Sequence, residues 1–302
     1  MTALPAVLPS PHPRSYLSVL ALGTASVVLF RGTLRELLAL ALSADAYSYI
    51  VLVPLISAFV IYLERRRVFA AVRPDRSVAV VSVLAVSLAI YAVLALRVAR
   101  VPAEYELSTK VFSLLLVWIA GFAFCCGTTA LRAARFPFLL LFLLVPLPSH
   151  LMEKIVTALQ WGSAETAYLV FRLFGVPVFR QGVNFELPVV GIEVARECSS
   201  IHSACALFIT GLLVGHLFAR TLWAKVSLTL LTVPIAMLTN AVRITTLWFL
   251  ATKVDIGFLY GNLHRNGGIL FSLVSLSILM SFLSFLRKLE RKPLDTPGSY
   301  AG

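Results

Sequence analysis

The sequence predicts an all-α polytopic membrane protein with about eight transmembrane helices. Of its 302 residues, 59% are hydrophobic and only 13% are charged, whereas soluble domains carry about 25% charged residues. The mean hydropathy is +0.91. Apolar runs recur along the chain, several of them close to the roughly 20 residues that a helix needs to cross a bilayer. This composition excludes a conventional cytosolic enzyme and also a disordered chain, which needs low hydrophobicity.

Eight apolar runs are the candidate spans, and together they form one membrane domain over residues 1–302. We interpret the first run as a retained span, because no convincing cleavage site precedes Arg31. The stretch 32–43 contains charged residues and is expected to be a surface or re-entrant piece. The fifth run is short and is expected to finish at the interface. The runs lie at about 15–30, 47–63, 77–96, 111–127, 136–150, 199–218, 226–251 and 267–286.

The distribution of Lys and Arg predicts the orientation of the spans. Alternate loops and both termini hold 14 basic residues in 59 positions, with a net charge of +10. The other loops hold 11 basic residues in 91 positions, with a net charge of +1. We therefore expect both termini in the cytoplasm and the protein in the cell inner (cytoplasmic) membrane as a multi-pass protein. The basic pI of about 10.0 reflects this loop asymmetry, and we expect no nucleic-acid partner.

The longest segment between spans, 151–197, is predicted to lie outside. Residues 151–174 are apolar with scattered charges and are expected to lie along the membrane interface. The segments 183–187 and 192–194 alternate in polarity on either side of turn residues, which predicts a short β-hairpin. This hairpin leads directly to Cys198 and the sixth span.

Arg243 lies inside the seventh apolar run. A charged residue within a span costs about 2.5–3.5 kcal/mol on insertion scales, so such a residue is a functional candidate. Ten residues separate Arg243 from Lys253, which places it about 15 Å below the outer end of a helix. The alternative is a structural arginine that snorkels or pairs.

Cys198 and His264 stand at the outer starts of the sixth and eighth spans. The positive end of a helix dipole lowers the pKa of a thiol near it and favours the thiolate. A thiolate, a histidine and a fixed cation are the groups that acyl transfer through a thioester requires. Cys125, Cys126 and Cys205 lie within apolar runs and are expected to be packing residues.

A rival arrangement uses Cys198, His202 and Cys205. Their i, i+4, i+7 spacing puts them on one helix face, where two thiols and an imidazole could bind zinc. His264 could serve as the fourth ligand. His202 could instead replace His264 as the catalytic base.

The motifs resemble the exosortase/archaeosortase family of integral-membrane sorting proteases over most of the chain. The segment from Asp45 to Ile56 looks like the family's early segment, and Arg65–Arg67 like its basic turn. The stretch that precedes the nucleophile is similar at Pro146–Pro148 and Leu173–Val178. The three catalytic boxes are similar at Val194–Ser200, where Ser200 replaces the usual glycine, at Asn240–Ile244 and at His264–Gly268.

The resemblance implies a cysteine protease/transpeptidase with Cys198, Arg243 and His264 as the catalytic set, no metal and no cofactor. The implied partners are exported proteins whose C-terminal sorting signal comprises a short motif, a transmembrane helix and a basic cluster. Membrane lipid and a cell-surface acceptor are further expected partners, and the active site is expected on the extracytoplasmic face. The alternatives are a transporter or channel with Arg243 as an anion site, and a membrane acyltransferase.

Overall fold

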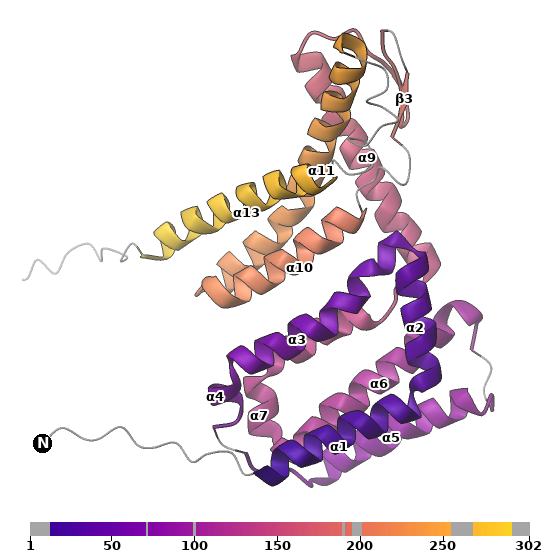
Figure 1. The fold of residues 1–302 in the computed structure, drawn as a ribbon, viewed down its shortest axis with the longest axis vertical. Coiled ribbons are helices and arrows are strands. Elements are labelled where there is room, and N and C mark those ends of the chain that lie inside the picture. The colour runs from indigo at the N-terminus through magenta and orange to yellow at the C-terminus, as the bar shows by residue number, and fades with distance from the viewer. Residues whose placement is uncertain are drawn as a thin grey trace, which may run out of the picture. The chain divides into compact units, whose positions relative to one another are not determined.

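The computed structural model describes residues 13–70, 72–98, 101–188, 191–194, 201–254 and 268–291. The chain divides into two compact units, residues 1–152 and 153–302, and each is described by itself (Figure 1). The expectation of a single membrane domain over 1–302, with 151–197 outside, stays a prediction.

The first unit is helical. It contains α1 (Pro13–Leu29), α2 (Arg31–Ser43), the 3-10 helix η1 (Asp45–Val51), α3 (Leu52–Leu63), α4 (Arg65–Val68), α5 (Val78–Ala95), α6 (Ala103–Cys126), α7 (Thr128–Ala133), α8 (Arg135–Leu141) and the 3-10 helix η2 (Phe142–Leu144). Helix α9 (Ser149–Leu173) begins in the last residues of the first unit and continues into the second. The second unit continues with β1 (Phe179–Gln181), β2 (Asn184–Glu186), β3 (Ile192–Glu193), α10 (Ile201–Phe218), α11 (Leu222–Lys253) and α13 (Gly268–Arg291).

The membrane-spanning architecture is confirmed. Among the described residues, six helices are long and apolar enough to cross a membrane, and there are up to eight spans if two bent helix pairs each count as one. The first pair is α1 with α2, bent by 76°, and the second is α8 and η2 with α9, bent by 97°. The stretch 32–43, which the sequence set apart from the first span, is therefore a helix that turns away from it.

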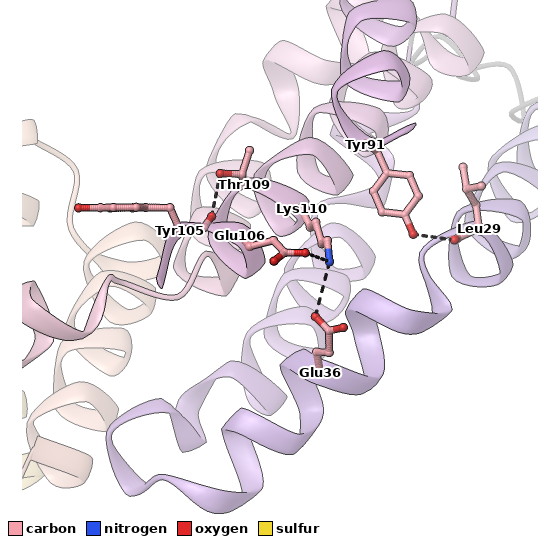
Figure 2. A network of polar contacts seen from close by, with 7 residues as sticks. All are labelled: Leu29, Glu36, Tyr91, Tyr105, Glu106, Thr109 and Lys110. Carbon is pink, nitrogen blue, oxygen red and sulfur yellow. Dashed lines mark hydrogen bonds and ion pairs between the residues drawn. The ribbon is translucent and has the colours of Figure 1, made fainter. Parts of the chain in front are cut away.

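In the first unit, α6 packs against both α1 and α5 (Figure 1). The core between them centres on Phe30 and Leu114, both almost fully buried, and the ring of Phe30 lies 3.9 Å from that of Tyr91. Helix α6 begins at Ala103, eight residues before the expected run. Lys110 therefore lies within the helix, where its ammonium pairs with Glu106 at 2.6 Å and with Glu36 of α2 at 4.0 Å (Figure 2).

A close backbone contact joins the segment before α5 to the end of α6. The amide of Arg73 donates to the carbonyl of Cys126 at 3.1 Å, and that of Asp75 donates to the carbonyl of Ala123 at 3.3 Å. Gly127 ends α6 with φ +97°, and a Cβ there would stand 2.0 Å from the carbonyl oxygen of Arg73. Only glycine meets both demands, the left-handed backbone and the lack of space.

In the second unit, α10, α11 and α13 lie side by side (Figure 1). Their common core contains Leu207, Leu228, Ile235 and Leu279. Helices α10 and α11 approach closely at Gly211, where a Cβ would stand 2.6 Å from the Thr232 side chain. Helices α10 and α13 begin just after the predicted Cys198 and His264 boxes, and α11 contains the Arg243 box.

The predicted hairpin is confirmed as the antiparallel pair β2–β3, in which Phe185 lies opposite Ile192. The sequence missed β1, which pairs with the other edge of β2 and makes a three-stranded sheet of order β1-β2-β3. Phe185 packs into a core with Phe171 of α9 and Trp248 of α11. The sheet is thus fixed against the helix that carries Arg243.

Candidate functional site

Arg243 lies on α11 and is half-buried. The helix ends at Lys253, as the sequence predicted, so ten residues or about 15 Å of helix separate the guanidinium from that end. The face of α11 that bears Arg243 and Asn240 lines a narrow pocket of about 20 Å³, room for about one water molecule. Side chains from α10 and α13 complete its walls.

Hydroxyl groups from all three helices surround this pocket. Ser203 of α10 and Ser272 of α13 form a hydrogen bond at 3.5 Å, and Ser275 donates to the hydroxyl of Thr239 at 2.9 Å. Asn240, Thr239 and Ser275 are each less than 9% exposed. The pocket therefore presents polar donors and a cation inside an apolar bundle, where such groups interact more strongly than in water.

The pocket adjoins a larger cavity of about 460 Å³ between α10 and α13. Ser203, Ser272 and Ser275 line both spaces. The remaining walls of the larger cavity are mostly apolar, and its rim carries His202. A ligand that filled this cavity would meet the hydroxyl groups beside Arg243.

Two of the predicted site residues, Cys198 and His264, lie outside the described residues. Their neighbours in sequence are described: α10 begins at Ile201, three positions after Cys198, and α13 begins at Gly268, four positions after His264. Ser203 in the first turn of α10, and Phe271 and Ser272 at the end of the first turn of α13 and the start of its second, share the pocket with Arg243. The structure thus brings the starts of both helices to Arg243.

The segment that leads to Cys198 is fixed at Val194. Its carbonyl oxygen accepts a hydrogen bond from the side-chain amide of Gln160 at 2.5 Å, and its amide donates to Val183 at 3.0 Å. Val194 is fully buried and Gln160 is 8% exposed. A buried hydrogen bond of this kind determines position, because breaking it leaves an unsatisfied polar group at a cost of about 1–3 kcal/mol.

Helix α13 is held at both of its ends. Near its first turn, Ser272 contacts Ser203 of α10. At the far end, the carboxylate of Glu290 accepts hydrogen bonds from the backbone amides of Arg220 and Thr221 at 2.8–3.2 Å, which satisfies free donors at the start of α11. The direction of α13 relative to Arg243 is fixed by these contacts.

The sequence allows two alternative roles for residues at the start of α10: a zinc site and His202 as the catalytic base. His202 is exposed and Cys205 is half-buried, both in the first two turns of the helix. Their proposed zinc partners, Cys198 and His264, lie outside the described residues, so the zinc arrangement stays a prediction. The same holds for His202 as the base.

Sequence reasoning missed Gln160, Ser203 and Ser272. Serines are common in membrane helices, and nothing local separates these from Ser277 or Ser281, which bond to their own helix. A usable signal was the i, i+3 spacing of Ser272 and Ser275, which places both on one face. Gln160, an amide in an otherwise apolar stretch, was a second one.

The family comparison agrees with this architecture. The model of the family described as transmembrane exosortase matches residues 41–281, which include Cys198, Arg243 and His264. No curated protein and no solved structure matches the chain at a significant level. The match extends from the last turn of α2 to the middle of α13. With most of its length matched, this multi-pass membrane protein belongs to the transmembrane exosortases, a family of membrane proteases and transpeptidases.

Proposed function

We propose that this chain is a cysteine protease/transpeptidase of the inner (cytoplasmic) membrane that cleaves C-terminal sorting signals of exported proteins at the outer face. Cys198 is the nucleophile, Arg243 stabilises the oxyanion and His264 is the general acid and base. The observation that carries this assignment is the pocket in which Arg243 meets the first turns of α10 and α13.

Chain length supports the proposal. Three residues of extended chain span at most about 11 Å and four span about 14 Å. Cys198 precedes the first residue of α10 by three positions, and His264 precedes that of α13 by four. Cys198 and His264 are therefore each only a few residues from the start of a helix. The first turns of these two helices line the pocket that contains Arg243.

The chemistry assigns each group one task. The Cys198 thiolate attacks the scissile carbonyl carbon and forms a C–S bond, while the carbonyl π electrons move to oxygen. The guanidinium of Arg243 binds that oxyanion. The oxyanion then collapses, the C–N bond breaks, and protonated His264 gives its proton to the leaving amine. Water or the amine of an acceptor attacks the thioester, His264 takes its proton, and the thiolate is released.

The test is a pair of cysteine variants. Cys198→Ala should be inserted normally and leave the sorting substrate uncleaved, because only the thiolate can form the thioester. Cys205→Ala is the matched control on the same helix and should retain most of the cleavage. The measurement is the cleaved fraction of substrate in cells, normalised to enzyme level by blot.

Equal loss in both variants at normal enzyme levels would contradict the proposal and favour the zinc arrangement. Zinc content measured on the purified protein would then show whether a metal is bound. Normal cleavage by Cys198→Ala would remove the cysteine mechanism altogether.

A further inference from the structure

One end of the first unit carries an unusual concentration of arginine. Seven arginines of α4, α7, α8 and the segment before α5 are exposed, against two acidic residues, Glu64 and Asp75. We call this set the arginine face, and it comprises Arg65, Arg66, Arg67, Arg73, Arg76, Arg132 and Arg135. With Glu64 and Asp75 included, the net charge at this end of the unit is +5.

The described contacts hold the parts of this face together. Helix α4, which carries Arg66 and Arg67, packs against α7, which carries Arg132. The backbone bond from Arg73 to Cys126 places Arg73 beside Gly127, where α7 begins. Helix α7 also packs against α8, which begins at Arg135. Three short helices and one extended segment therefore carry these arginines at the same end of the unit.

Most of these side chains have no partner within the described protein. The guanidinium of Arg65 donates to the carbonyl of Tyr62 at 2.8 Å and lies 4.2 Å from the centre of its ring, and Arg76 lies over Phe124. The other five side chains make no ion pair or hydrogen bond with any described residue. The donors of five guanidinium groups are thus open to an external anion.

The nearby acids do not neutralise the face. The backbone amide of Ser77 donates to the Asp75 carboxylate at 2.9 Å, and this bond holds the pKa of Asp75 below its ordinary value. The carboxylate of Asp75 thus accepts a hydrogen bond in the turn before α5 and forms no ion pair with the described arginines. Helix α2, which carries Arg31 and Arg35, lies away from α4 and α7 (Figure 1). There Lys110 is ion-paired with Glu36 and Glu106, and Arg97 lies near Glu106 (Figure 2).

An apolar stripe leads up to the arginine face. Leu55, Phe59 and Tyr62 of α3 are each more than half exposed, and their i, i+4, i+7 spacing places them on one face of the helix. Helix α3 lies in a membrane span, so this stripe faces acyl chains, with the Tyr62 ring at the level where aromatic residues meet headgroups. A ligand that fits both parts has a phosphate at one end and hydrocarbon at the other.

We propose that the arginine face, with the exposed stripe of α3, is a binding site for an anionic phospholipid. The headgroup phosphate accepts hydrogen bonds from Arg66, Arg67 and Arg132, and an acyl chain lies along Leu55 and Phe59. Arginine suits this task because its planar fork binds phosphate oxygens in pairs. By the charge distribution of the loops, the lipid belongs to the cytoplasmic leaflet.

The experiment uses the purified full chain in a non-ionic detergent at low ionic strength. A fluorescent short-chain phosphatidylglycerol and the matching phosphatidylcholine are titrated onto three proteins. These are the wild type, the variant Arg66/Arg67/Arg132→Gln, and the control variant Arg31/Arg35/Arg97→Gln, which loses the same number of charges away from the arginine face. Circular dichroism and gel filtration verify the fold of each.

The wild type should prefer phosphatidylglycerol. Each arginine near an anionic headgroup contributes about fivefold in affinity, so the first variant should bind phosphatidylglycerol at least about tenfold more weakly. The control should change by less than about twofold. Equal loss in both triple variants would indicate general charge attraction and would overturn the site.

Inorganic phosphate distinguishes a phospholipid from a free anion. At matched ionic strength it should displace little of the bound phosphatidylglycerol, because it gains nothing from the apolar stripe. Complete displacement would overturn the lipid assignment. Should the triple variant fail to fold, Arg66/Arg67→Gln gives a second measurement at two exposed positions, with Arg31/Arg35→Gln as its control.

Discussion

The side-chain amide of Gln160 donates to the carbonyl oxygen of Val194 across 2.5 Å, four residues before Cys198. This bond ties the residue that follows β3 to α9 at a buried point. Val194 is the described residue closest in sequence to Cys198 on its N-terminal side, and we therefore predict that Gln160 positions the proposed nucleophile.

Replacing Gln160 should slow processing without abolishing insertion. Gln160→Leu leaves the carbonyl of Val194 unsatisfied, and a displacement of about 1 Å at a reacting group can cost about a hundredfold in rate. We expect a 10- to 100-fold fall in the rate of substrate cleavage at constant enzyme level. Thr166→Val is the control, because among the described residues the hydroxyl of Thr166, on the same helix, bonds only to the carbonyl of Gly162. Equal rates for both variants would remove the positioning role.

Arg243→Lys distinguishes an oxyanion ligand from a structural cation. Lysine keeps the charge but lacks the planar fork of donors, and losing one oxyanion donor costs about 10²–10³-fold in rate. We therefore expect a normally inserted protein with cleavage reduced by that factor. Arg243→Ala should be at least as inactive. Near-normal cleavage by the lysine variant would contradict the oxyanion role and favour a structural pair.

The predicted orientation can be tested in intact cells. A membrane-impermeant thiol reagent should label the wild type and not Cys198→Ala, because we expect Cys198 on the outer face. A reporter fused to the C-terminus should be active only in the cytoplasm, and a reporter inserted after Phe174 should be active only outside. Activity of the C-terminal reporter on the outer side would invert the model.

Gly127→Ala should destabilise the first unit. The substitution forces a side chain into a left-handed backbone, which costs about 1–3 kcal/mol, and its Cβ would meet the Arg73 carbonyl at 2.0 Å. We expect a clear drop in the thermal unfolding temperature of the purified protein. Gly32→Ala in α2 is the control, since a Cβ there meets no atom within 4 Å. There we expect no loss of stability, and an equal drop in both variants would contradict the steric argument.

The spans could be predicted because each is a local property. Twenty apolar residues identify a helix such as α5 without reference to any other element. The hairpin at Phe185 and Ile192 was predictable for the same reason, since alternation and turn residues lie within one short segment. Arg243 stood out because a charge in an apolar run is rare.

What the sequence did not reveal depends on contacts between distant segments. Strand β1, Phe179–Gln181, contains a single apolar residue, so no alternation of apolar and polar residues marks it. The predicted run at about 111–127 left Lys110 outside the helix, because one of the carboxylates that balance its charge is Glu36, seventy-four positions away. The pocket hydroxyls Ser203 and Ser272 meet only because α10 and α13 pack together. Such pairings are set by tertiary packing, which local patterns do not encode.

Helix α11 serves two structures at once. On one side Ala241, Ile244 and Trp248 form part of the core beneath the sheet, and on another Asn240 and Arg243 line the polar pocket. Because one helix forms part of both, we expect a ligand bound to Arg243 to reduce the motion of the sheet as well. Linkage is reciprocal: an anionic inhibitor held by Arg243 should slow hydrogen exchange at the amides of Phe185 and Val194, which its own atoms need not touch.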